Sequence, residues 1–199
     1  MRRLEFWYDL ASNYSYLSAM RITALAEHAG VEVAWRPFLL GPIFKARGWT
    51  SSPFNLFPDK GRNMVRDMQR ICEERGLAFE LPAPFPANSL LAVRIAHGSE
   101  AEGWTPAFTR SVFMAEFGTA ANIADPQVLG RILGDIGLDA AAVIADTGTD
   151  TARESLRART ADAQARGIYG APSFVTEDGE LFWGDDRLEQ AMRWAVRHP

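Results

Sequence analysis

The sequence predicts an α/β fold whose sheet is built from both ends of the chain, with a helical segment inserted between them. Three observations support this prediction. Residues 4–38 follow the pattern strand, helix, strand, and residues 168–197 contain a strand hairpin followed by a helix. The residues from about 42 to 165 show mainly helical spacing of apolar side chains. We therefore expect one four-stranded sheet and a large helical insertion.

The N-terminal segment is predicted to be a compact βαβ unit. An apolar and aromatic run indicates a strand at residues 4–9, and an apolar stripe indicates a helix over about 13–28. Gly30 is typical of a helix C-terminus, and the alternating residues that follow predict a second strand at 31–38. Strands joined by a helical crossover run parallel, so these two should be parallel.

The middle of the chain is predicted to be helical. Asp125-Pro126 marks one helix start, because a capping residue precedes proline at the first helical position. The proline-rich residues 80–89 are interpreted as a connector within the fold. The expected helices are 62–75, 88–98, 105–117, 126–136 and 149–166. We divide the chain into a sheet-containing domain, 1–41 and 166–199, and an inserted helical domain, 42–165.

The C-terminal segment is predicted to be a ββα unit. The stretch "SFVTEDGELFWG" contains two short strands about Asp178-Gly179, which is a strong hairpin signal. An amphipathic helix follows, and Asp186 with Glu189 three residues later resembles a capping box. Proline just before a strand tolerates the cis isomer, and we expect the Ala171-Pro172 bond to be cis.

Composition narrows the possible function. The chain has 199 residues, of which 47% are hydrophobic, and a net charge of -4. Scattered arginines and this acidic balance argue against nucleic acid as a partner. No apolar run approaches the ~20 residues of a membrane span, and the N-terminus does not read as an export signal. We expect no metal site and no membrane partner.

The single cysteine limits redox chemistry. One cysteine, Cys72, rules out an internal disulfide and fits a reducing cytoplasm. It lies beside the apolar face of the helix predicted at 62–75. We therefore interpret it as a buried, inert thiol.

Ser12 is the main candidate for chemistry. It lies at the tight turn between the first strand and the first helix, where unpaired N–H groups and the helix dipole favour an anion. Its hydroxyl can donate to such an anion, or it can simply cap the helix. As a nucleophile it would need a base and an orienting group, and none of the 3 histidines has the context of a Ser-His motif.

These features resemble a known fold. The turn Ser12-Asn13-Tyr14-Ser15 after the first strand and Ala171-Pro172 before the hairpin resemble the thioredoxin fold, and the insertion resembles its DsbA-like branch. Redox members have Cys-x-x-Cys at this turn. Disulfide exchange requires a thiolate, so it cannot occur through the serine-containing turn of this chain.

More specifically, the chain resembles 2-hydroxychromene-2-carboxylate isomerases and their relatives, the kappa-class glutathione transferases. The resemblance runs from about residue 4 to 190. It is carried by the stretches "FWYDLASNYSYLS", "PFLLGPIFKARG", "NLFPDKGRNMVRDMQR", "GIYGAPSFV" and "LFWGDDRLE". Two positions depart from the family pattern: Asn13 stands where proline is usual, and Asn63 where a tyrosine is expected.

The resemblance implies glutathione as a bound thiol cofactor, with Ser12 as the catalytic residue that hydrogen-bonds its sulfur. A hydroxyl donor favours the thiolate form. The resemblance also implies a homodimer. The residues that it implies for glutathione are Asn55 and Lys60 at the carboxylate end, Ala171 and Pro172 at the cysteinyl part, and Asp185 and Asp186 at the γ-glutamyl ammonium.

The implied activity is a cis-trans isomerisation in aromatic compound degradation. 2-Hydroxychromene-2-carboxylate would be converted to trans-o-hydroxybenzylidenepyruvate by reversible thiolate addition. The enolate formed needs nearby positive charge or donors, and Lys45, Arg47 and Trp49 are candidates by position. Two alternatives stay open: a kappa-type glutathione transferase or peroxidase, and a non-catalytic thioredoxin-fold binding protein.

Overall fold

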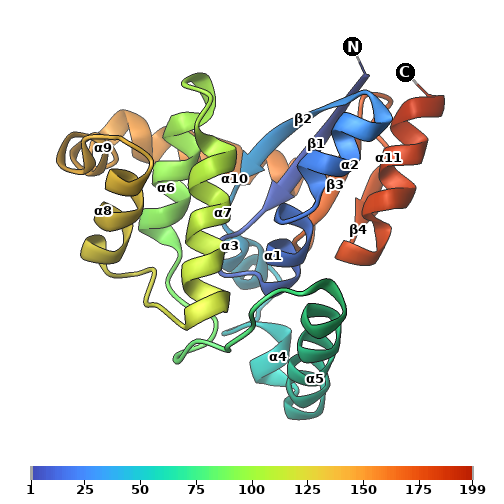
Figure 1. The fold of residues 1–199 in the computed structure, drawn as a ribbon, viewed down its shortest axis with the longest axis horizontal. Helices are drawn as coiled ribbons and strands as arrows, with labels where there is room; N and C mark the ends of the chain where they lie inside the picture. Colours follow the sequence, from blue (N-terminus) through green and yellow to red (C-terminus); the bar gives the residue numbers. More distant parts are fainter. Residues whose placement is uncertain (1, 199) are drawn as a thin grey trace.

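The computed structural model describes residues 2–198 and contains the expected sheet. Its strand order is β2-β1-β3-β4, with β1 and β2 parallel and the other two pairs antiparallel (Figure 1). The strands are β1 (Arg2–Tyr8), β2 (Val31–Pro37), β3 (Ser173–Thr176) and β4 (Leu181–Trp183). The prediction that both ends of the chain share one four-stranded sheet is confirmed.

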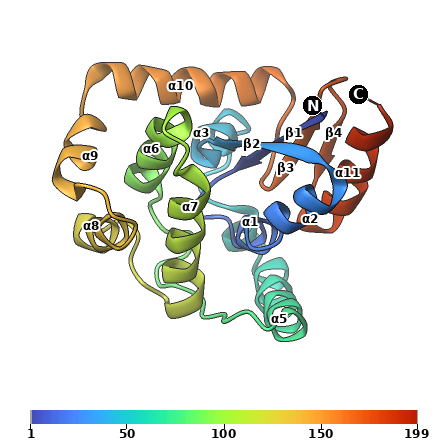
Figure 2. The same ribbon diagram turned by 45° about the horizontal axis from the view of Figure 1, so that its top comes forward.

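Alternation along the strands gives the sheet two buried faces. Phe6, Phe174 and Phe182 lie opposite one another across β1, β3 and β4 and belong to the main core, together with side chains of α2 (Ile22–Ala29) and α11 (Leu188–Arg197). Trp7 and Val175 belong to a smaller cluster on the other face with Ile43 and Ala163. These two come from α3 (Leu40–Ala46) and α10 (Asp150–Ala165), and Figure 2 shows α10 running from α9 to the sheet.

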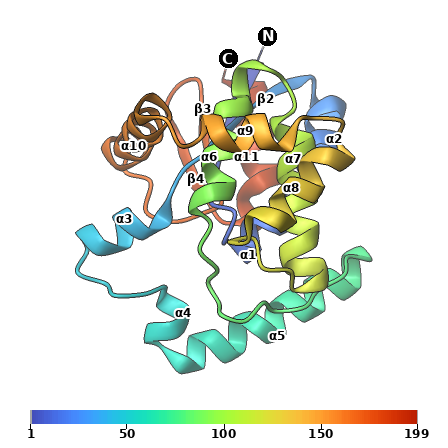
Figure 3. The same ribbon diagram turned by 90° about the vertical axis from the view of Figure 1, so that its left-hand side faces the viewer.

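The inserted segment is helical, as predicted (Figure 3). α4 and α5 lie beneath α1, at the end of the sheet where β1 leads into that helix (Figures 1 and 3). The remaining bounds are α4 (Pro53–Leu56), α5 (Pro58–Arg75), α6 (Leu90–Gly98), α7 (Thr105–Phe113), α8 (Pro126–Asp135) and α9 (Ala140–Asp146). A 3-10 turn, η1 (Ser99–Ala101), follows α6, and a π-helical turn, η2 (Met114–Gly118), follows α7. The domain boundaries at 41/42 and 165/166 stay a prediction.

Several helix boundaries differ from the prediction. α3, α4 and α9 were not predicted because each is short, with seven, four and seven residues. α5 begins at Pro58 rather than at 62, and the α-helical part of 105–117 ends at Phe113. The predicted helix 13–28 is divided into α1 (Asn13–Ala19) and α2. The division falls at Arg21, which leaves helical geometry while its side chain binds Asp185.

Local capping signals had mixed outcomes. Gly30 ends α2 in the left-handed conformation, and Asp125 caps α8 through the amide of Gln127, as expected. The capping box at Asp186 was wrong. α11 begins at Leu188 with no side-chain cap, and Asp185–Arg187 form a 3-10 turn, η3, instead. Glu189 turns away to pair with Arg21, because that tertiary ion pair competes with the local cap.

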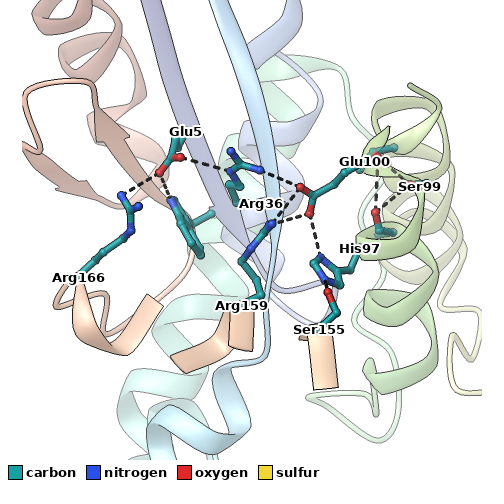
Figure 4. Close-up of polar contacts among 11 residues, drawn as sticks. Glu5, Arg36, His97, Ser99, Glu100, Ser155, Arg159 and Arg166 are labelled. Atoms are coloured by element: carbon teal, nitrogen blue, oxygen red, sulfur yellow. Dashed lines mark hydrogen bonds and ion pairs between the residues drawn. The ribbon is translucent and has the colours of Figure 1, made fainter. Parts of the chain in front are cut away.

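A half-buried charge network ties the sheet to the inserted helices (Figure 4). Glu100 in η1 accepts hydrogen bonds from Arg36 of β2 at 2.8 Å, from Arg159 of α10 at 2.6 Å, and lies 3.0 Å from His97 Nδ1. Arg36 also reaches Glu5 of β1 at 3.4 Å. One carboxylate thus connects β2 with α6 and α10.

This network predicts acid sensitivity. Burial alone would raise the pKa of Glu100, but hydrogen bonds from His97 and Arg159 lower it to about 2. An unfolded glutamate titrates near ~4.3, so the carboxylate stabilises the fold above that pH. Its contribution is lost as the pH falls from about 4.3 towards about 2. Glu100→Gln should therefore be less stable than the unmodified protein at pH 7, with a difference that shrinks in acid.

Urea unfolding at a series of pH values measures this difference. Glu154→Gln, an exposed change on α10, is the matched control and should follow the unmodified protein throughout. A Glu100→Gln deficit that stays the same between pH 7 and pH 2.5 would contradict the assigned ion pairs.

Candidate active site at the start of α1

Ser12 lies where the turn after β1 meets the loop before β3. It occupies the N-cap of α1, and its Oγ accepts a hydrogen bond from the Ser15 amide at 3.3 Å. The same hydroxyl donates to the Ala171 carbonyl at 3.0 Å. The capping interpretation of Ser12 is confirmed, and the hydroxyl also faces Ala171, a residue 159 positions away that the resemblance implicates. Donation from Ser12 to a bound anion stays a prediction.

The amides at this helix start are less free than the sequence suggests. The Ser15 N–H is bonded to Ser12 Oγ, and the Tyr14 N–H is bonded to Asn13 Oδ1 at 3.0 Å. α1 is also only seven residues long. The Ser12 hydroxyl is engaged as well, so it could donate to a ligand only by releasing the Ala171 carbonyl.

The Ala171-Pro172 bond is cis, as predicted. The loop is held close to β4, because the Gly184 amide donates to the Pro172 carbonyl at 3.0 Å. The same packing explains Gly170, where a Cβ would lie 2.3 Å from the indole nitrogen of Trp183. Any larger residue at 170 would push Trp183 away from the loop.

A surface pocket of about 400 Å³ opens beside this loop. Its wall includes Tyr169 and Trp183, whose ring centroids are 5.0 Å apart, and the Arg47 guanidinium lies 5.5 Å from the Tyr169 ring. Asp186 also lines the pocket, with its carboxylate exposed and 3.2 Å from Arg187. Aromatic, cationic and anionic groups from distant segments thus meet here.

Asp185, adjacent to Asp186 in sequence, is in a different environment. It is only 4% exposed. One of its oxygens accepts from Ser18 Oγ at 2.9 Å and Arg21 Nε at 3.1 Å, and the other lies 2.8 Å from Arg75 Nη2. Its hydrogen-bonding capacity is largely taken by α1, α2 and α5.

A second, mostly apolar pocket of about 260 Å³ lies between α4, α5 and the connector. Asn55 lines it and donates to Ser51 Oγ at 3.0 Å and to the Phe85 carbonyl at 2.9 Å. Met64 is part of the same wall and accepts from Asn13 Nδ2 at 2.6 Å. Asn13, one of the departures from the family pattern, therefore links the Ser12 turn to this pocket.

The other predicted residues lie at the surface around these pockets. Lys60 is exposed, with its ammonium 4.9 Å from the Phe57 ring centroid. Lys45 is exposed in the last turn of α3, and the Trp49 ring packs at a tilt against Phe44, with 5.5 Å between the ring centroids. No hydrogen bond within residues 2–198 joins Lys45, Arg47 or Trp49 to Ser12.

Cys72 is buried, as predicted, at 1% exposure. Burial raises the pKa of its thiol to about 11, so it is protonated at neutral pH. Sequence reasoning missed Tyr169 and Trp183, although both lie in stretches that carry the resemblance. It also missed Asp9 and Glu116, two buried carboxyls for which no local motif exists.

Residues 2–198 hold no group of three or more side chains that could ligate a metal ion. Among the same residues, every helix is too short or too polar to cross a membrane.

Comparisons with known proteins agree with this geometry. A 2-hydroxychromene-2-carboxylate isomerase from Sphingobium xenophagum is 27% identical, over 94% of this chain and 95% of its own length. Human glutathione S-transferase kappa 1 is 25% identical, over 94% and 88%. A solved 2-hydroxychromene-2-carboxylate isomerase superimposes with a TM-score of 0.88 at 25% identity, covering 98% of this chain and 95% of that one.

The sheet and the helical insertion are thus shared with this solved isomerase, which superimposes on nearly the whole chain. The family model described as a DsbA-like thioredoxin domain matches residues 3–193, and the chain belongs to that family.

Proposed function

We propose that this protein is a glutathione-dependent isomerase that acts on 2-hydroxychromene-2-carboxylate or a related aromatic-degradation intermediate. The observation that carries the proposal is the hydrogen bond from Ser12 Oγ to the carbonyl of Ala171, next to the cis proline. It places a hydroxyl donor beside the bend that leads into β3, and Tyr169 of the same loop lines the first pocket. Relatives named isomerases and glutathione transferases support the same function.

The donor set fits glutathione, which has an ammonium at one end and a carboxylate at the other. Asp186 offers an exposed carboxylate at the first pocket. Sequence neighbours of Ala171 and Ser12 contact the two pockets: Tyr169 borders the first, and Asn13 contacts Met64 of the second. Beyond Met64, the exposed Lys60 ammonium supplies donors for a carboxylate, and the Asn55 amide would first have to release Ser51 or Phe85.

The environments of the two adjacent aspartates divide their roles in this proposal. Asp185 is enclosed by two guanidinium groups and the Ser18 hydroxyl, so an ammonium ligand would have to displace existing partners. Asp186 is exposed and has one exposed partner, Arg187. We therefore assign the γ-glutamyl ammonium to Asp186. Asp185, the first residue of η3, would instead hold this turn against its neighbouring helices.

2-Hydroxychromene-2-carboxylate is a cyclic hemiketal that opens to a cis-enone. Bound glutathione would supply the thiolate for reversible addition to this enone, so that the former double bond could rotate as a single bond before elimination restored both the double bond and the thiolate. Ser12 would turn its hydroxyl from the Ala171 carbonyl to the sulfur and stabilise its negative charge. Lys45 and Arg47 would face the substrate carboxylate and the developing enolate oxygen. Tyr169 and Trp183 would cover the aromatic ring, because they present exposed faces beside Arg47.

A kappa-type transferase is the second candidate. The exposed Tyr169 and Trp183 leave the first pocket open, so electrophiles of several shapes can approach the sulfur. The two activities differ in stoichiometry. An isomerase regenerates glutathione with each turnover, whereas a transferase consumes one molecule for each product. The proposal also includes that the protein forms a homodimer and acts in a reducing compartment.

Titration calorimetry with reduced glutathione tests the cofactor site. We expect binding, and Asp186→Asn should weaken it about five-fold, since an exposed charge pair contributes about 1 kcal/mol. Asp135→Asn, an exposed change on α8, is the matched control and should leave binding unchanged. No binding by the folded protein would favour the non-catalytic alternative.

Turnover of 2-hydroxychromene-2-carboxylate with substoichiometric glutathione then separates the two enzymes. Product formation far beyond the amount of glutathione indicates isomerisation. A reaction that stops when glutathione is exhausted indicates a transferase.

A further inference from the structure

Asp9, the residue just after β1, joins three segments through one buried carboxylate. It is 4% exposed. Its Oδ1 accepts from the Ala11 amide at 3.0 Å and from Ser89 Oγ at 2.6 Å, and its Oδ2 accepts from the Leu40 amide at 2.8 Å. The Asp9 carbonyl also accepts from the Ser12 amide at 2.9 Å.

Each of these segments carries part of the proposed site. Ala11 precedes Ser12 in the active-site turn. Leu40 is the first residue of α3, the helix that ends next to Arg47. Ser89 is the N-cap of α6 and closes the connector whose Phe85 carbonyl holds Asn55. One carboxylate therefore sets the spacing between the sulfur-binding hydroxyl and the cationic end of α3.

A second buried carboxyl, that of Glu116, lies near Asp9, so the ionisation of the two groups has to be considered together. Glu116 lies in the π-helical turn η2, is fully buried, and neither of its oxygens has a hydrogen-bond partner. Burial raises the pKa of Glu116 well above its usual value, and the neighbouring Asp9 charge raises it further. Burial raises the pKa of Asp9 as well, but three hydrogen bonds to its carboxylate oppose that rise, whereas Glu116 has none. Of the two carboxyls, Asp9 is therefore the one that ionises more readily.

An ionised carboxylate is required at position 9 by the arrangement of donors. Two N–H groups and one hydroxyl converge on it. A carboxylate accepts at both oxygens, whereas an amide in its place would set its NH₂ against one of these donors. Loss of the hydrogen bond from the Leu40 amide would release the N-terminus of α3. Ser12 and its neighbours in the sequence would stay the same.

We propose that Asp9 is a positioning residue that fixes the cationic end of α3 relative to Ser12, and so determines turnover of a carboxylate-bearing substrate rather than binding of the thiol. This inference rests on the proposed function and deepens it. The residue touches neither cofactor nor substrate. Its effect reaches the reaction through the Leu40 amide and the placement of Lys45 and Arg47.

Asp9→Asn tests the inference, with Glu116→Gln as the matched change in the neighbouring buried carboxyl. Asp9→Asn should lower kcat for the chromene carboxylate about ten-fold, the kind of loss that misplacement of a reacting group produces. Glutathione affinity should stay within about two-fold, because Ser12 and Ala171 do not depend on α3. Glu116→Gln should leave both unchanged.

A neutral electrophile separates positioning from general damage. 1-Chloro-2,4-dinitrobenzene reacts with a glutathione thiolate but carries no carboxylate for Lys45 or Arg47. Its enzymatic rate should be nearly the same in Asp9→Asn and in the unmodified protein. Equal losses with both electrophiles, or a loss of glutathione binding, would overturn the inference.

Leu40→Pro gives an independent variant if Asp9→Asn does not fold. Proline removes the amide donor yet suits the first position of a helix, and Leu39 already has the extended geometry that precedes proline. The same selective loss of chromene turnover is expected. Hydrogen exchange across residues 40–47 should speed up in both variants. Unchanged exchange and turnover would overturn the inference.

Failure of the proposed function would look different. In that case the unmodified protein itself would not turn over the chromene carboxylate. Hydrogen exchange would still test the role of Asp9 in positioning α3. Unaltered protection of residues 40–47 in Asp9→Asn would exclude that role.

Discussion

Replacing Ser12 with alanine is expected to lower kcat for the chromene carboxylate about 100-fold, because the sulfur loses its hydrogen-bond donor in the transition state. The fold should survive. The substitution removes the helix cap at Ser15 and the bond to Ala171, a loss of about 1 kcal/mol against a typical total of about 5–15 kcal/mol. Activity should therefore fall far more than stability.

The ionisation of bound glutathione reports the cause directly. The pKa of its thiol, followed by ultraviolet absorbance of the thiolate in the binary complex, should rise in Ser12→Ala towards the value of free glutathione. A kcat loss without a change in this pKa would place the role of Ser12 in substrate orientation instead.

Cys72→Ser is the control for thiol chemistry. Cys72 is 1% exposed, and burial raises its pKa to about 11. This change should lower stability modestly and leave turnover nearly unaltered. If Cys72 proved essential and Ser12 dispensable, the protein's own thiol would carry the reaction and the glutathione proposal would be wrong.

The sheet could be predicted because its signals are local. Apolar alternation defines β2, and Asp178-Gly179 defines the β3–β4 hairpin, with Gly179 at a φ of 86°. The split between α1 and α2 could not be predicted. It falls at Arg21, whose partners Asp185 and Glu189 lie at the other end of the chain. The same ion pair removed the expected capping box at Asp186.

Only part of the candidate site could be predicted for a similar reason. Ser12 and Ala171 stand in recognisable motifs, and the structure brings them within 3.0 Å. No motif marks Asp9, because its proposed positioning role depends on hydrogen bonds from two amides and one hydroxyl that lie on three separate segments. Asp185 and Asp186 are chemically identical neighbours, so only the fold distinguishes the buried one from the exposed one.

The largest effect on stability is expected at Asp185. Asp185→Ala would leave Arg75 without its partner and the Ser18 hydroxyl without an acceptor, while Arg21 would keep Glu189 and the main-chain carbonyl of residue 185. The side chains of Arg21 and Arg75 are only 19% and 29% exposed, so water compensates incompletely. Removing one partner of a buried ion pair typically costs about 3–5 kcal/mol, and we expect about 3 kcal/mol because Arg21 retains Glu189.

Asp186→Ala is the matched control, one residue away and exposed. Its stability should stay within about 0.5 kcal/mol of the unmodified protein. Denaturant unfolding measures the free energy of unfolding of each variant, and calorimetry measures its affinity for glutathione. The two variants should show opposite patterns: Asp185→Ala loses stability, and Asp186→Ala loses glutathione affinity. A stable Asp185→Ala protein that no longer binds glutathione would show that Asp185 is the ammonium ligand, with its arginine contacts replaced when glutathione binds.

The position of Asp185 also predicts where the damage would appear. Its three partners come from the end of α1, the break before α2, and the C-terminus of α5, while Asp185 itself begins η3 ahead of α11. Hydrogen exchange in Asp185→Ala should therefore rise first at the α1–α2 junction and at the start of α11. Residues 90–98 of α6, which lie away from this ion pair, should stay protected at the same denaturant concentration. Uniform loss of protection across all three regions would indicate that Asp185 supports the whole fold rather than the junction beneath the site.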